Sequence, residues 1–222
     1  MKKIITVCLI ILIGIIITNC TVKKFNELDK IDSPKEGSKE LTYYNDGLRL
    51  YYANDYQKAI ESFRKVIGLN PANADAYYGL GLAYGGLGEN ESEIESYQKA
   101  ISINPNHADA YYGLALASAE TGNHYKEIEY LNEVVRIKPD LYYVHYALGY
   151  AYTNLDDYIN ALKHYQEAIR LKPDDANLHG NIAIVYIMAG DIESAKNEYE
   201  ILKTLDKKLA DELYDKIYSR EK

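Results

Sequence analysis

Asn-Pro-Ala-Asn-Ala-Asp-Ala-Tyr-Tyr-Gly-Leu, residues 70–80, recurs as Asn-Pro-Asn-His-Ala-Asp-Ala-Tyr-Tyr-Gly-Leu at residues 104–114, a shift of 34 positions. The same interval of 34 residues separates four prolines along the chain, which are Pro71, Pro105, Pro139 and Pro173. A fixed period of this length is the signature of a repeat array, in which each unit buries its apolar face against its neighbours.

The residues around each proline favour a pair of helices in every unit. Proline cannot continue a preceding helix, so each proline ends one helix and makes the next one start afresh. Asp and Asn shortly after the prolines are suited to cap that new helix. Midway through each unit stands a residue that tolerates a left-handed backbone, as a tight turn between two helices requires. These residues are Asn54, Gly88, Gly122, Asp156 and Gly190.

The pattern resembles the tetratricopeptide repeat. With the prolines at repeat position 32, the resemblance covers residues 40–209 as five units: 40–73, 74–107, 108–141, 142–175 and 176–209. Position 8 holds the expected small residues, Gly47, Gly81, Ala115, Gly149 and Ala183, and position 24 holds large ones, Phe63, Tyr97, Leu131, Tyr165 and Tyr199. The resemblance implies an all-α, right-handed superhelix of helix-turn-helix repeats. At position 20 the family has a small residue, and Glu93 and Glu127 depart from this, which predicts looser helix pairs in those two units.

The chain continues after the fifth unit with an amphipathic segment. Leu209, Leu213 and Ile217 recur every four residues on one face, and charged residues cover the other. The end of a solenoid needs a terminal element that shields its last apolar surface from water. The sequence therefore predicts a capping helix over residues 210–222.

The N-terminus has the order of an export signal. A basic start, Lys2 and Lys3, precedes an apolar run from Ile4 to Ile17, which is the arrangement of a secretory signal peptide over residues 1–19. Residues 17–20, Ile-Thr-Asn-Cys, resemble the lipobox of bacterial lipoproteins, although that family prefers Leu first and a small residue before the cysteine. The resemblance implies lipidation of Cys20, and an uncleaved signal anchor is the alternative. Residues 20–39 then form a polar tether to the repeats.

The composition excludes several classes of function. There are 33 acidic and 25 basic residues, a net charge of −8, which disfavours nucleic acid as a partner. The glycine-rich residues 79–88 follow no predicted strand, and the nucleotide, metalloprotease and hydrolase motifs are absent. The five histidines form no pair at helical metal-ligand spacing. We therefore expect no enzyme activity, no cofactor and no metal site.

The family builds its concave groove from first-helix positions 2, 5, 9, 12 and 13. Carried over to this chain, those positions are rich in tyrosine, mildly acidic and without Lys or Arg, and four tyrosines at position 5 (residues 44, 78, 112 and 146) should form a ladder. The predicted partner-binding residues are Tyr44, Tyr51, Tyr52, Asp75, Tyr78, Asp109, Tyr112, Glu120, Tyr143, Tyr146, Tyr150, Asn154 and Asn177. The Lys and Asn of the family's carboxylate clamp are replaced by Tyr and Leu or Ile, with Gly180 at position 5 of the fifth unit.

The sequence thus predicts a non-catalytic adaptor or scaffold of the bacterial cell envelope, facing the periplasm or the cell exterior. Its expected ligand is a peptide or helix with apolar anchors and Lys or Arg, because tyrosine offers an apolar face, a hydroxyl and a surface for cations. A glycan-binding envelope protein is the alternative, since stacked tyrosines also suit sugar rings. Whether the membrane is the inner or the outer one stays open.

Overall fold

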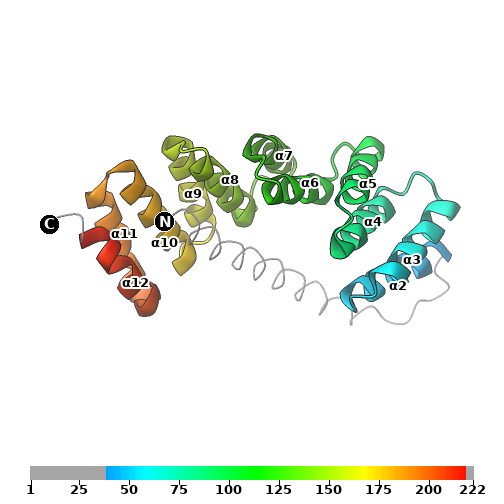
Figure 1. Ribbon diagram of the computed structural model, residues 1–222, viewed down its shortest axis with the longest axis horizontal. Helices are drawn as coiled ribbons and strands as arrows, with labels where there is room; N and C mark the ends of the chain where they lie inside the picture. The colour runs from blue at the N-terminus through cyan, green and yellow to red at the C-terminus, as the bar shows by residue number, and fades with distance from the viewer. Residues whose placement is uncertain (1–38, 219–222) are drawn as a thin grey trace. The chain divides into compact units, whose positions relative to one another are not determined.

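The computed structural model describes residues 39–218 and contains eleven helices within that range (Figure 1). The predicted signal peptide, Cys20 and the tether up to residue 38 lie outside the described residues. Among the helices of residues 39–218, none has both the length and the apolar character needed to cross a membrane.

The helices form five antiparallel pairs and a final single helix. The first helices of the pairs are α2 (Lys39–Tyr52), α4 (Ala74–Leu87), α6 (Ala108–Glu120), α8 (Tyr142–Asn154) and α10 (Ala176–Ala189). The second helices are α3 (Tyr56–Leu69), α5 (Asn90–Ile103), α7 (His124–Ile137), α9 (Tyr158–Leu171) and α11 (Ile192–Leu205), and the single one is α12 (Lys207–Tyr218). The all-α array of paired helices is as predicted.

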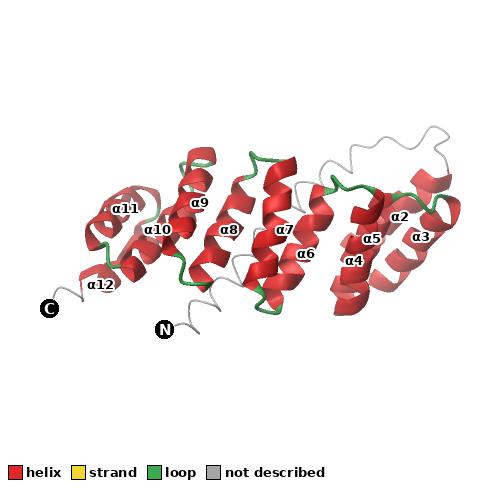
Figure 2. Cartoon of the chain, turned by 90° about the horizontal axis from the view of Figure 1, so that it is seen from above, coloured by secondary structure: helices red, strands yellow, loops and turns green. Residues whose placement is uncertain are grey.

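The chain divides into two compact units, residues 1–71 and residues 72–222. Within its described part the first unit consists of α2 and α3. The second unit holds α4 to α12, and Figure 2 shows its helix pairs following one another in chain order.

The turns inside the pairs have the backbone that the sequence predicts. Asn54 and Asp156 have φ angles of 60° and 58°, and Gly88, Gly122 and Gly190 have φ angles between 72° and 84°. These values lie in the left-handed region, which reverses the chain between two helices with a minimum of residues. The identity of these five residues is therefore a local cause of the hairpin in every pair.

The starts of the first helices are capped unequally. Asn73 accepts a hydrogen bond from the backbone N–H of Ala76, and Asp175 accepts one from Asn177. At α6 the cap is His107, whose ring accepts from Ala110, and α8 begins after Leu141 without a side-chain cap. The prediction of Asp or Asn caps is therefore confirmed for two helices of the second unit and wrong for α6 and α8.

Large aromatic side chains fill the space between helices where the facing helix carries glycine. The ring of Tyr97 lies between α4 and α6, and a Cβ added at Gly81 or Gly113 would come within 2.4 Å or 2.6 Å of it. Tyr165 is packed in the same way against Gly149. In the first unit, Phe63 packs against Gly47. The close approach allowed by these glycines is what lets an aromatic residue occupy position 24.

The two helix pairs with glutamate at position 20 are not looser than the others. α4 packs against α5, and α6 against α7, as extensively as the remaining pairs do. Glu127 is only 4% exposed, and its carboxylate lies 2.8 Å from Nδ1 of His124. The prediction of looser pairs is therefore wrong. Glu127 is buried beside His124 and Glu93 lies against Gly85, so neither side chain holds the helices apart.

The last helix covers the apolar end of the fifth pair. Ala210, Leu213 and Ile217 of α12 are buried in one cluster with residues of α10 and α11, which are Ala183, Ile187, Ala195, Tyr199 and Leu202. Leu209 also packs beside Gly180, 3.3 Å from the position of an added Cβ. The helix begins at Lys207, three residues before the predicted start of the capping segment, because Asp206 accepts a hydrogen bond from the N–H of Leu209.

Candidate functional site

The predicted groove residues of the first unit lie on one helix. Tyr44, Tyr51 and Tyr52 are half-buried on α2. Tyr44 meets the ring of Phe63 edge-on at 5.8 Å between ring centroids, and Tyr51 contacts both Tyr52 and Tyr56. These contacts orient the tyrosine rings within the first unit.

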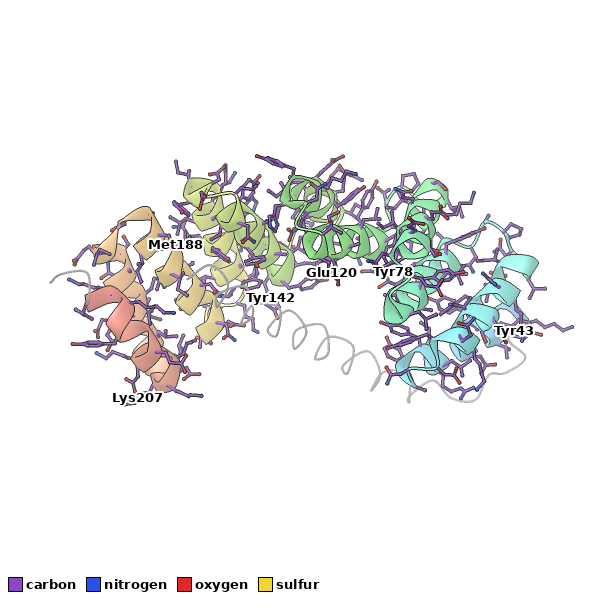
Figure 3. The ribbon with its side chains drawn as sticks, viewed as in Figure 1. Tyr43, Tyr78, Glu120, Tyr142, Met188 and Lys207 are labelled. Carbon is purple, nitrogen blue, oxygen red and sulfur yellow. The ribbon has the colours of Figure 1, made fainter. Side chains whose placement is uncertain are left out.

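In the second unit the predicted residues come from four first helices. α4 carries Asp75 and Tyr78, α6 carries Asp109, Tyr112 and Glu120, α8 carries Tyr143, Tyr146, Tyr150 and Asn154, and α10 carries Asn177. Figure 3 labels Tyr78 and Glu120, which belong to neighbouring pairs. Apart from Tyr146, every one of these side chains is exposed or half-buried.

Two of the predicted groove acids have basic partners within their own repeat. Nδ1 of His107 accepts from a backbone N–H, so Nε2 carries the proton and donates it to Asp75 over 3.2 Å. Lys138 lies 3.5 Å from Asp109. Both partners stand at the end of the repeat that begins with the acid. Lys138 offsets part of the charge that Asp109 presents to a ligand, and the hydrogen bond from His107 occupies one acceptor site of the Asp75 carboxylate.

The tyrosines of neighbouring repeats meet at different positions from those predicted. Tyr112 contacts Tyr143 edge-on at 5.3 Å, which joins position 5 of one repeat to position 2 of the next. Tyr78 packs against Tyr97 and the His107 ring, at 5.8 Å and 5.2 Å. Tyr112 and Tyr143 thus touch between α6 and α8, whereas Tyr78 of α4 packs on α5 and on the cap of α6. These three half-buried tyrosines of successive first helices are called the tyrosine patch below.

Tyr146 is not part of an open surface. Its side chain is 4% exposed, its ring packs against Tyr165, and its hydroxyl accepts a hydrogen bond from Asn181 over 3.1 Å. Burial raises its pKa well above the ordinary value. The prediction of Tyr146 as a ladder member at the surface is wrong, because Asn181 of α10 provides a polar partner that permits full burial.

The structure adds one residue that the repeat positions did not place in the groove. Glu93 of α5 is half-buried, and a Cβ added at Gly85 would lie 2.7 Å from its carboxylate oxygen. Gly85 occupies position 12 of its repeat, one of the groove positions. Desolvation and, as a smaller cause, the negative charge of Glu120 raise the pKa of Glu93 to about 7. A weaker hydrogen bond from Tyr97 opposes this shift. The sequence could have indicated this residue, because a glutamate at position 20 is combined with a glycine at position 12 of the same repeat.

The buried histidines serve the turns between repeats. His145 donates from Nε2 to the carbonyl of Pro139, and His179 donates in the same way to Pro173, both over 2.9 Å. His164 stacks between Tyr152 and His145, and burial with the nearby His145 lowers its pKa to about 4. Within residues 39–218 no group of three or more His, Cys, Asp or Glu side chains is placed to hold a metal ion.

Replacing Glu93 with Gln should stabilise the protein above neutral pH. Because the carboxyl pKa is raised in the folded state, the fold holds a proton that the unfolded chain releases, so stability falls as pH rises from about 4.5 to about 7. Gln cannot ionise, and we expect Glu93→Gln to gain about 1–2 kcal/mol at pH 8, a value discounted for partial solvent screening, and little at pH 5. Urea unfolding at both pH values measures this.

The control for this prediction is Glu95→Gln, on the exposed face of the same helix. It should leave the difference between the two pH values as it is in the unaltered protein. An equal effect of both substitutions would show that Glu93 carries no special burial cost.

Four family models match the chain. One is described as TPR repeat and matches residues 47–88, and three are described as Tetratricopeptide repeat and match residues 74–107, 96–129 and 142–175. Together they span more than half of the chain. No curated protein sequence matches it.

Solved structures share the fold at low sequence identity. A crystal structure of MamA protein superposes with a TM-score of 0.69 at 23% identity, covering 79% of this chain and 96% of its own. MamA 41-end from Desulfovibrio magneticus RS-1 gives 0.69 at 20% identity, covering 78% and 97%. YrrB, described as a TPR protein with an unusual peptide-binding site, gives 0.68 at 20% identity, covering 80% and 94%. At these identities the likeness concerns the fold.

Proposed function

The chain belongs to the tetratricopeptide repeat family, and we propose that it binds a peptide or helical segment of another protein on the tyrosine-bearing face of α4, α6 and α8. It is a non-catalytic interaction scaffold. The observation that carries the proposal is the patch formed by Tyr78, Tyr112 and Tyr143, together with the carboxylates of Glu93 and Glu120. Such rings supply a large, rigid contact area at low entropic cost, and aromatic residues are enriched at protein interfaces.

The charges around the patch support a cationic ligand with apolar anchors. Neither Glu93 nor Glu120 has an ion-pair partner within residues 39–218, and the groove positions there contain no Lys or Arg. A cation over an exposed tyrosine face contributes about 0.5–1 kcal/mol. The unusual peptide-binding site described for YrrB supports the same use of the fold.

Site-specific photocrosslinking tests where the partner lies. A photoreactive phenylalanine at position 112 should crosslink to the partner, and the same group at position 125 should not. Tyr125 is a matched control, because it is a tyrosine of the neighbouring second helix α7 and is 76% exposed. Crosslinks from position 125 alone would place the binding surface on the second helices, and recovery of only peptidoglycan fragments would favour a glycan ligand.

We also propose that the array is anchored by lipid on Cys20 and faces the periplasm or the cell exterior. The support lies in the sequence, where a signal-like run ends at this cysteine. Cys20→Ser should abolish incorporation of labelled fatty acid and leave an unprocessed precursor, since the thiol is the acyl acceptor. Gel analysis after labelling measures both effects, and equal labelling of the Cys20→Ser protein would contradict the proposal.

A further inference from the structure

Two buried histidines occupy the same repeat position and make the same bond to the preceding turn. His145 in the fourth repeat and His179 in the fifth both stand at position 4 of their first helix. Each donates from Nε2 to the carbonyl of the proline near the end of the preceding repeat, Pro139 or Pro173. Because Nε2 carries that proton, the Nδ1 of each ring is left to meet the residue at position 23 of the second helix.

The residue at position 23 differs between the two repeats. In the fifth repeat it is Glu198, whose carboxylate lies 2.7 Å from Nδ1 of His179. In the fourth repeat it is His164, whose Nδ1 lies 3.4 Å from Nδ1 of His145. Only one proton fits between these two facing nitrogens, and within residues 39–218 no carboxylate forms an ion pair with either ring. The fifth repeat therefore accommodates an imidazolium ion at position 4, whereas the fourth repeat gives it no counter-ion.

The charged groups around the pair of imidazoles do not balance an added proton. On α9, Lys163 lowers the pKa of His164 and Glu167 raises it. The Glu167 carboxylate is bound by Arg170 over 2.6 Å, and Asp140 in the turn before α8 acts on that arginine. α7 packs against α8 through an apolar cluster, and no charged residue of α7 or α10 within residues 39–218 acts on His164. Burial, together with the facing imidazole, therefore lowers the pKa of His164 to about 4.

The start of α8 depends on the same pair. α8 follows Leu141 without a side-chain cap, whereas α10 is capped by an aspartate. The hydrogen bond from His145 to the Pro139 carbonyl ties this uncapped helix start to the preceding turn. Tyr143 of the tyrosine patch lies in the first turn of α8 and meets Tyr112 of α6. A displacement of His145 therefore affects the part of α8 that carries a patch residue.

We propose that the His145–His164 pair is an acid-sensitive latch that holds the start of α8 and, with it, the tyrosine patch. Protonation in mild acid separates the two imidazoles, because a buried charge there has no counter-ion. His145 then leaves the Pro139 carbonyl, and the first turn of α8 opens. The effect of the latch on partner binding rests on the proposed function, whereas the opening of α8 does not depend on any partner.

The direction of the pH dependence follows from which form binds protons more tightly. In the open form the imidazoles are solvated and have the ordinary histidine pKa of about 6.5, whereas the pKa of His164 in the closed form is about 4. The open form therefore binds more protons. Its population rises as the pH falls from about 6.5 to about 4, by up to about tenfold per pH unit.

Amide hydrogen exchange of the full chain without a partner measures the opening. Each observed rate is divided by the intrinsic exchange rate at the same pH, which gives the opening equilibrium of that amide. We expect opening of residues 144–148 in α8 to increase about tenfold between pH 7.5 and pH 5.0. The equivalent residues 178–182 in α10 should change less than about threefold. In parallel, NMR of carbon-13-labelled histidine should show the His164 ring titrating below pH 5.

Two reciprocal substitutions exchange the arrangements of the fourth and fifth repeats. His164→Glu copies the His179–Glu198 pair into the fourth repeat and should remove most of the acid-induced opening of residues 144–148. Glu198→His copies the paired imidazoles into the fifth repeat and should make residues 178–182 acid-sensitive, which tests the latch even if His164→Glu does not fold. Glu200→His, on the exposed face of α11, is the control and should change neither response.

The latch is overturned by an equal increase of opening in α8 and α10, by no increase in α8, or by an increase that persists in His164→Glu. Calorimetric titration of the purified partner at both pH values tests the effect on binding. The unaltered protein should lose about tenfold in affinity at pH 5.0, and His164→Glu should lose less. Equal losses in both would show that the latch does not control binding. Absence of crosslinks from position 112 would contradict the proposed function and leave the opening of α8 unaffected.

Discussion

Deleting residues 207–222 should destabilise the fifth helix pair and leave the earlier pairs of the second unit protected. The deletion removes Leu213 and Ile217, which are 4% and 0% exposed, and uncovers Leu202 and Tyr199. Burial of each large apolar side chain contributes about 1.5–3 kcal/mol, so the loss is on the order of 5 kcal/mol. In a repeat array each repeat is stabilised by its contacts with adjacent repeats. Hydrogen exchange should therefore accelerate first in α10 and α11 and least in α4 and α5.

Two substitutions on α12 test whether its buried apolar side chains stabilise the fifth pair, because they leave the length of the chain unchanged. Leu213→Ser with Ile217→Ser should reproduce most of the deletion's effect, because the buried side chains are lost while the helix keeps its length. Lys208→Ser with Glu212→Ser, on the exposed face, should have little effect. Unchanged exchange in α10 and α11 after the deletion would show that α12 does not cover the array.

The sequence predicted the helix pairs well because their determinants are local. A 34-residue period, a proline after each second helix and a turn residue such as Asn54 or Gly88 each restrict the backbone within a few residues. The aromatic and glycine contacts, as between Tyr97 and Gly81, follow the repeat positions. Such features need no knowledge of residues distant in the chain.

The candidate site was less predictable, because exposure and charge depend on contacts between segments that are distant in the chain. Tyr146 shares position 5 with Tyr78 and Tyr112, and its burial results from Asn181 and Tyr165 on other helices. The partners of Asp75 and Asp109, His107 and Lys138, stand about 30 residues away. Repeat position places a residue on the first-helix face, but it does not specify whether a side chain from a distant part of the chain covers it or pairs with it.

Glu93 shows how a departure from a family pattern can carry information. Taken alone, glutamate at position 20 predicted a defect in packing. Taken with Gly85 on the facing helix and with Asn90 in place of His124, it marks a carboxylate whose charge the described residues leave unbalanced. The comparison of equivalent positions within one chain provides the signal that a single position lacks.

Tyr78→Ala combined with Tyr112→Ala should weaken partner binding at least tenfold. Each aromatic anchor at the centre of an interface contributes about 1–2 kcal/mol, and both residues are half-buried members of the patch. The rings also contact Tyr97, His107 and Tyr143, so the fold of the variant must be checked by circular dichroism and urea unfolding. Raising the salt concentration should weaken binding further, because the acidic field that attracts a cationic partner is screened.

The matched control is Tyr125→Ala combined with Ile159→Ala, two strongly exposed side chains on the second helices α7 and α9. Calorimetric titration of the purified partner into both folded double variants and the unaltered protein measures whether the partner binds at Tyr78 and Tyr112. We expect at least a tenfold loss of affinity for the Tyr78 and Tyr112 variant and unchanged affinity for the control. Unchanged affinity in the first variant, with a loss in the second, would contradict it.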